Sequence, residues 1–253
     1  KKTIEQSILI FMKQLIIFLL LLTTLISYGQ TMSKETTNSE FKKVQIGINI
    51  SLDNTFRKLK NNGGSSTVDD IIKIRNENET YKTGYTTGLN VCFNIKNNVG
   101  LETGIQLSNK GYQTKKEDLN FGQANPKEPN NIRFIYNYHY IDIPVKANFT
   151  IGKRKVRFHT SFGITTNIFI KETQKTVLVY SDHTDKKTTQ TNFNYNKVNI
   201  TPTISVGIDY KINSRMNLRV EPTFRYGILK ITNDPLTEYL YSGGLNISYY
   251  FGL

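Results

Sequence analysis

Residues 156–168 read VRFHTSFGITTNI, a stretch in which larger, mostly apolar side chains alternate one for one with smaller or polar ones. The even positions hold valine, phenylalanine, isoleucine and threonine, whereas the odd positions hold residues such as Arg157, His159 and Asn167. Successive side chains of a β-strand point to opposite faces. This stretch therefore predicts a strand with one apolar face and one polar face.

Seven other segments alternate in the same way, so the sequence predicts eight strands in all. The other segments are 44–52, 85–95, 99–108, 138–151, 200–212, 217–228 and 244–253.

The connections between these segments alternate in length. Three are short turns, at 96–98, 152–155 and 213–215. The other four are long and polar, at 53–82, 114–132, 171–192 and 229–237. Short turns at one end, long loops at the other and an even strand number are typical of outer-membrane barrels. We predict an all-β fold, an eight-stranded antiparallel up-and-down transmembrane β-barrel with short periplasmic turns and long extracellular loops.

The amino-terminal part has the pattern of an export signal. Residues 12–30 read MKQLIIFLLLLTTLISYGQ, with a basic residue, an apolar run and a small-residue end. The apolar run is shorter than the ~20 residues of a spanning helix, which favours a signal peptide cleaved after Gly29. We expect Met12 to be the natural start, residues 1–29 to be upstream residues and signal, 30–43 a periplasmic tether, and 44–253 the barrel.

The charge balance by itself suggests a nucleic-acid-binding protein. Lys and Arg number 33 against 20 Asp and Glu, a formal charge of +13. Removal of 1–29 takes away three basic residues and one acidic residue and leaves +11. Because an exported protein does not meet the genome, we expect no nucleic-acid partner.

The composition of the two faces distinguishes a membrane barrel from a soluble one. A soluble barrel turns its apolar face inward, whereas a membrane barrel turns it outward to lipid. The apolar faces here are nearly free of charge, and the last segment ends on Tyr249, Phe251 and Leu253 at alternate positions, which resembles the insertion signal of bacterial barrels. These features favour the outer membrane of a Gram-negative bacterium.

The polar faces carry a balanced set of charges. An eight-stranded barrel has an interior just wide enough to be filled by side chains, and unpaired charges there are costly. We therefore predict a structural network of ion pairs, neither a pore nor a catalytic site. Its members are Glu102, Asp142, Lys146, Arg157, Asp209, Lys211, Arg219, Glu221 and Arg225.

A second set of basic residues lies at the short-turn end, where we expect contact with anionic lipid headgroups of the periplasmic leaflet. Simple hydration of turn residues is the alternative. The set comprises Lys42, Lys43, Lys96, Lys153, Arg154, Lys155 and Arg215.

The sequence offers little for catalysis or metal binding. The single cysteine, Cys92, excludes an internal disulfide. Of the three histidines, His139 and His159 are assigned to the lumenal face and His183 to a long loop. We expect no catalytic, cofactor-binding or metal site.

Several segments resemble a known family. Residues 100–112 (GLETGIQLSNKGY) and 138–145 (YHYIDIPV), together with 244–251 (GLNISYYF), resemble strands of the Bacteroidetes outer-membrane β-barrel family that includes PorT-like proteins. The resemblance implies the barrel fold, and some family members assist protein secretion. It supplies no catalytic residues.

Function remains open among three classes. The first is a structural or interaction protein, including an accessory of secretion, that meets secretion-machinery or cell-surface proteins through its long loops. In those loops we expect a short helix at 68–74 and a strand extension at 176–180. The second is a soluble secreted barrel that binds a small ligand, and the third is an outer-membrane lipid-modifying enzyme.

Overall fold

The computed structural model describes residues 43–119, 128–191 and 193–253. Within these ranges the chain forms one helix and eleven strands. Eight strands are long: β1 (Val44–Asn61), β3 (Lys82–Lys96), β4 (Val99–Thr114), β6 (Asn131–Ile151), β7 (Val156–Val179), β9 (Val198–Lys211), β10 (Met216–Tyr226) and β11 (Leu236–Gly252). The others are the helix α2 (Ser66–Asn78) and the strands β2 (Glu79–Thr80), β5 (Glu117–Asp118) and β8 (Thr184–Gln190).

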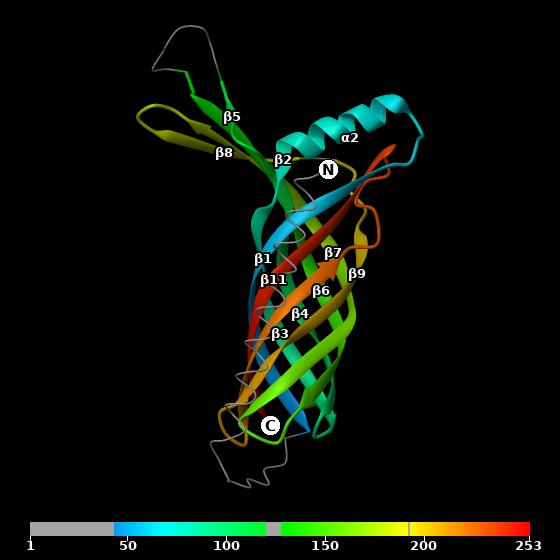
Figure 1. Cartoon of the computed structure of the whole chain (residues 1–253), viewed down its shortest axis with the longest axis vertical. Coiled ribbons are helices and arrows are strands. Elements are labelled where there is room, and N and C mark those ends of the chain that lie inside the picture. Colours follow the sequence, from blue (N-terminus) through cyan, green and yellow to red (C-terminus); the bar gives the residue numbers. More distant parts are fainter. Residues whose placement is uncertain (1–42, 120–127, 192) are drawn as a thin grey trace, which may run out of the picture.

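The eight long strands close into a ring. Each pairs antiparallel with its neighbour in the order β1, β3, β4, β6, β7, β9, β10, β11. The ring closes because β11 returns to β1, with pairs running from Gln45 and Gly252 to Asn61 and Leu236. Figure 1 shows the resulting tilted, elongated barrel. The predicted eight-stranded antiparallel barrel is confirmed.

The barrel is apolar outside and polar inside. On β1, Ile48, Ile50 and Leu52 are more than half exposed, whereas Asn49 and Ser51 between them are buried. The same alternation continues around the ring, with buried Asn, Ser, Thr and charged residues inside. This is the arrangement that lipid around the barrel and polar contacts within it require, and the prediction of outward apolar faces is confirmed.

Several strands run farther than their alternation predicted. The first predicted segment ended at residue 52, but β1 continues to Asn61. Predicted loop 53–82 is therefore partly strand, followed by α2, which contains the expected short helix at 68–74. The signal peptide, the tether up to residue 42 and residue Lys42 lie outside the described residues.

A small sheet projects beyond the ring at the end with the long loops. The order of its strands is β5, β6, β7, β8. It forms because β6 and β7 stay paired up to Asn131 and Val179, past the last pairs that β4 and β9 make with them. A register shift beside His139 marks the point where this extension begins. Figure 1 shows β5 and β8 leaning away from the barrel.

Candidate functional site

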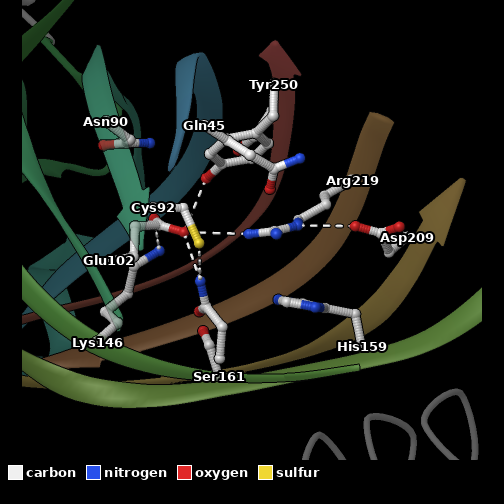
Figure 2. A network of polar contacts seen from close by, with 12 residues as sticks. Gln45, Asn90, Cys92, Glu102, Lys146, His159, Ser161, Asp209, Arg219 and Tyr250 are labelled. Atoms are coloured by element: carbon white, nitrogen blue, oxygen red, sulfur yellow. Dashed lines mark hydrogen bonds and ion pairs between the residues drawn. The ribbon is translucent and has the colours of Figure 1, made fainter. Parts of the chain in front are cut away.

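The periplasmic half of the lumen is organised around Arg219 of β10. Its guanidinium group contacts Glu102 of β4 at 3.1 Å and Asp209 of β9 at 2.9 Å, and its Cζ lies 4.2 Å from the ring centre of Tyr250. All four side chains are almost fully buried. One cation therefore joins acids from two strands on opposite sides of the barrel, as Figure 2 shows.

Further groups complete the shells of the two acids. Glu102 also accepts from Tyr250 Oη and from Asn148 Nδ2, each at 2.8 Å, and its other oxygen lies 2.6 Å from Lys146 Nζ. Asp209 Oδ1 forms an ion pair with Arg157 at 2.5 Å, and its Oδ2 accepts a hydrogen bond of 2.6 Å from Asn217 Nδ2. Buried charges need such saturation, because each unpaired one carries a large desolvation cost.

A third acid, Glu221, lies higher in the same lumen. Its Oε1 is 3.3 Å from His159 Nε2 and accepts a hydrogen bond of 2.7 Å from Ser205. Asn246 Nδ2 donates to the other oxygen at 3.3 Å. His159 is fully buried, and its contact with Glu221 makes it part of this network.

Two more ion pairs lie nearer the extracellular end. Arg225 contacts Asp53 Oδ1 at 2.9 Å, and Thr86 donates to the other oxygen of Asp53 at 2.7 Å. Lys110 lies 3.5 Å from Asp142, which also accepts a 2.6 Å hydrogen bond from Asn167.

Eight of the nine residues assigned to the lumenal network are buried in it, namely Glu102, Asp142, Lys146, Arg157, Asp209, Arg219, Glu221 and Arg225. The ninth, Lys211, is half-buried at the periplasmic end of β9. Two members were missed: Asp53, which the prediction placed in a loop, and Lys110, which lies beyond the predicted third strand.

His139 was assigned to the lumen, and this assignment is wrong. Tyr138 and Tyr140 on either side of it are buried inside the barrel, so strand alternation turns His139 to the other face of β6. There it lies beside Asn109 and Thr173, with contacts of 3.4 and 3.5 Å.

The extracellular end of the lumen is filled by aromatic rings. Tyr112, Tyr138 and Tyr140 form a buried cluster with Ile231 and Leu240. The ring centres of Tyr112 and Tyr138 are 6.3 Å apart. This layer separates the ion pairs below it from the extracellular surface.

The helix α2 closes the lumen above the aromatic layer through Arg75. Its guanidinium group contacts Glu79 and Glu238 at 2.6 Å each and donates to Tyr112 Oη at 2.7 Å. Arg57 of β1 contacts the same Glu79 at 2.6 Å. Burial lowers the pKa of Arg75, but Tyr112, Glu238 and Glu79 together raise it above its ordinary value, so the group stays charged. None of these residues was predicted as a site.

The lumen leaves almost no free space. Two cavities lie along it, each of about 10 Å³, one near Arg157 and Arg219 and the other near Lys146 and Arg225. Such a volume holds at most about one water molecule. Neither cavity therefore has room for a small organic ligand.

The rim bases lie where the sequence placed them, at the end opposite α2. Lys43, Lys96, Lys153, Arg154, Lys155 and Arg215 are all exposed on or beside the three short turns. The backbone ties this end together, since Leu253 N donates to Val44 O and Gly252 N to Arg215 O.

The described residues hold neither a metal cluster nor a membrane-crossing helix. No group of three or more His, Cys, Asp or Glu side chains in them is arranged to hold a metal ion. In the same ranges, α2 and every other helical segment is too short or too polar to cross a bilayer.

A closed ring of strands, apolar outside and plugged by polar side chains, defines the class of small outer-membrane β-barrels. The chain belongs to the family described as outer membrane protein beta-barrel domain, whose model matches residues 28–233. The protein is accordingly an outer-membrane protein.

The chain is also similar to several solved structures, at low sequence identity. Neisserial surface protein A is 10% identical, with a TM-score of 0.45 over 83% of this chain and 97% of that one. The outer membrane protein OprG from Pseudomonas aeruginosa is also 10% identical, with a TM-score of 0.47 over 85% and 99%. The outer membrane protease OmpT from Escherichia coli is 9% identical, with a TM-score of 0.42 over 87% and 100%. No match was found among curated protein sequences.

Proposed function

We propose that this protein is a non-enzymatic interaction protein that presents the projecting sheet β5–β6–β7–β8 to a protein partner at the cell surface. The observation that carries the proposal is the free edge of β8. Among the residues that the structure describes, this strand pairs only with β7, and all seven of its residues are exposed.

A free strand edge is a recognition surface for extended polypeptide. Its unpaired N–H and C=O groups hydrogen-bond to an added strand, and its side chains select the partner. β8 reads TDKKTTQ, so Asp185, Lys186 and Lys187 add charge to that edge. Charge on an edge discourages indiscriminate pairing. The edge therefore favours a partner segment with complementary charge.

The construction of the barrel supports a scaffold role. The lumen is filled, and the buried charges are engaged with one another. His159 is inaccessible, in contact with Glu221. The outward apolar face and outer-membrane family also argue against the soluble ligand-binding alternative.

The resemblance of 100–112 and 138–145 to PorT-like proteins leads to the finer form of the proposal. In this form the partner is a component of a protein-secretion machinery, and the barrel is an accessory of export.

The test removes the hairpin and keeps the barrel. In one variant, residues 177–186 are replaced by Asn-Gly, which joins Thr176 to Lys187, its partner across the hairpin. A second variant, Lys186→Glu with Lys187→Glu, keeps the hairpin and inverts its charge. Heat-modifiable migration in detergent gels reports whether each barrel is folded.

The expected result is that cross-linking in intact cells captures a protein partner with the natural chain and with neither folded variant. For the finer form, a deletion strain should lose secretion, and only the natural chain should restore it. Equal capture by all three proteins would overturn the interaction site. Normal secretion in the deletion strain would overturn the export role alone.

A further inference from the structure

The outer wall of the barrel carries a row of aromatic residues near its extracellular end. Phe56 of β1 lies 4.6 Å from Tyr81 and 6.0 Å from Tyr241, measured between ring centres, and Tyr241 lies 6.3 Å from Tyr226. Below this row the outward residues of β1 are the exposed Ile46, Ile48, Ile50 and Leu52. Aromatic girdles mark the membrane interface of barrels, so this row marks the upper boundary of the lipid-facing wall.

Lysines lie directly above this boundary on the same face. Lys58 and Lys60 follow Phe56 at alternate positions of β1 and are exposed. At ~3.3 Å per residue they lie about 7 and 13 Å farther along the strand. Lys230 lies half-buried in the connection after β10. None of the three makes an ion pair with an acidic side chain of the described residues.

A groove lies between these lysines. It measures about 700 Å³ and is lined by Lys60, Lys230, Tyr239, Ile228 and Leu229, among others. It forms because the chain leaves β11 after Gly227 and rejoins it at Ile231, as the hydrogen bonds to Leu240 O and Glu238 O show. Ile228 and Leu229 remain 48% and 40% exposed.

A second hollow of about 510 Å³ lies on the wall formed by β1, β10 and β11. It is lined by Lys58, Phe224, Tyr226 and Tyr241, together with residues at the top of β1. The two hollows thus place basic groups above and apolar or aromatic groups below.

We propose that this part of the wall binds a phosphorylated lipid of the outer leaflet. Lys58, Lys60 and Lys230 hold the phosphate of its headgroup, and its acyl chains pack on Ile228, Leu229 and the aromatic row. Two observations support a lipid as the occupant. The groove is continuous with the lipid-facing wall, and its unpaired lysines complement an anionic headgroup.

The test measures lipid retained by the purified protein in detergent, by native mass spectrometry. The probe is bisphosphorylated lipid A, compared with the same lipid lacking phosphate. The variant is Lys58→Gln with Lys60→Gln and Lys230→Gln. The matched control removes the same charge from the projecting sheet, as Lys175→Gln with Lys186→Gln and Lys187→Gln.

The natural protein should retain the phosphorylated lipid in preference to the other. The groove variant should retain at least about tenfold less phosphorylated lipid than the natural protein, since each lysine near the surface contributes separately. The control variant should retain as much as the natural protein. Equal loss in both variants, or no loss in the groove variant, would overturn the proposal. Complete displacement by millimolar inorganic phosphate would also overturn it, because the site would then bind a simple anion.

Folding of each protein is checked by heat-modifiable migration. If the triple variant does not fold, the single substitutions Lys60→Gln and Lys230→Gln carry the same expectation, at about threefold each.

Discussion

The two halves of the lumen are filled in different ways. In the periplasmic half, Arg219, Glu102 and Asp209 come from barrel strands and are joined by ion pairs. In the extracellular half, aromatic rings fill the space, and the ion pairs above them depend on Arg75, which lies on α2 outside the ring.

This difference separates two kinds of stability. The lower network is held by strands that are each paired on both sides within the ring, so we expect that no member can leave without opening the barrel. The helix α2 has no buried residues of its own, so its side-chain contacts, chiefly those of Arg75, hold it in place. We expect substitutions in the periplasmic half to lower the stability of the whole barrel, and substitutions in the extracellular half to destabilise only the nearby segment.

The largest effect is expected for Arg219→Met. The substitution removes the cation that Glu102 and Asp209 share and leaves each acid with one buried cation, Lys146 or Arg157. We therefore expect a cost of about 3 kcal/mol, the low end for a broken buried pair. Urea unfolding of the protein in micelles should show this loss as a lower midpoint.

The matched control is Arg219→Lys, which keeps a cation between the two acids. It should lose clearly less stability than Arg219→Met, because the charge of the network is unchanged. If Arg219→Lys is no more stable than Arg219→Met, the charge is not the cause.

A smaller effect is expected for Tyr250→Phe, also in the lower half. The phenol donates to the Glu102 carboxylate at 2.8 Å, and a hydrogen bond to a charged group contributes about 1.5–3 kcal/mol. The same unfolding measurement applies. Tyr249→Phe, on the outward-facing neighbour, is the control and should leave the midpoint nearly unchanged.

In the upper half, Arg75→Met should release α2 and leave the barrel folded. The guanidinium group is partly exposed, so we expect a local cost of about 1–2 kcal/mol. Hydrogen exchange over Ser66–Asn78 should become faster while exchange in β1 and β11 is unchanged. Lys73→Met, an exposed position of the same helix, should change neither. Faster exchange in β1 and β11 after Arg75→Met would contradict the division into two regions.

The smallest effect lies beyond both halves, at the β7–β8 turn. The hydrogen bond to Asp182 raises the pKa of the exposed His183 above its usual value. The contribution of this contact to the turn is therefore complete below the ordinary histidine pKa of about 6.5, and it is lost as the pH rises through the raised value. An NMR titration should give His183 a higher midpoint than in Asp182→Asn. Equal midpoints would contradict this assignment.

The sequence predicted the part of the fold that the bilayer controls. Where lipid lies outside and polar groups inside, alternation is strict, and it located the eight strands and eight buried members of the lumenal network. Toward the extracellular end the outward positions become mixed, with Asn54, Lys58 and Lys60 beside Phe56 on β1, so β1 past Leu52 and β7 past Ile168 carried a weaker signal. Asp53 was missed for this reason.

The sequence could not predict the contacts at the extracellular end, for a different reason. Arg75 and Glu238 are 163 residues apart and meet only because the ring brings β11 beside β1. Neither residue has a local pattern that marks a partner. The alternation places His139 on the face opposite to Tyr138 and Tyr140. The assignment of His139 to the lumen therefore did not follow from the pattern that located the other lumenal residues.

The pairing of β1 with β11 determines the order in which the barrel can assemble. Asp53 near one end of the barrel sequence forms its ion pair with Arg225, far along the chain. Glu102 likewise accepts a hydrogen bond from Tyr250, 148 residues later. A partly assembled ring therefore exposes acids and bases that have not yet met and must remain hydrated. Closing so long a loop is slow, and water leaves the interior only when the two ends join. We therefore expect strand closure and charge neutralisation to occur together, late in the assembly of this barrel.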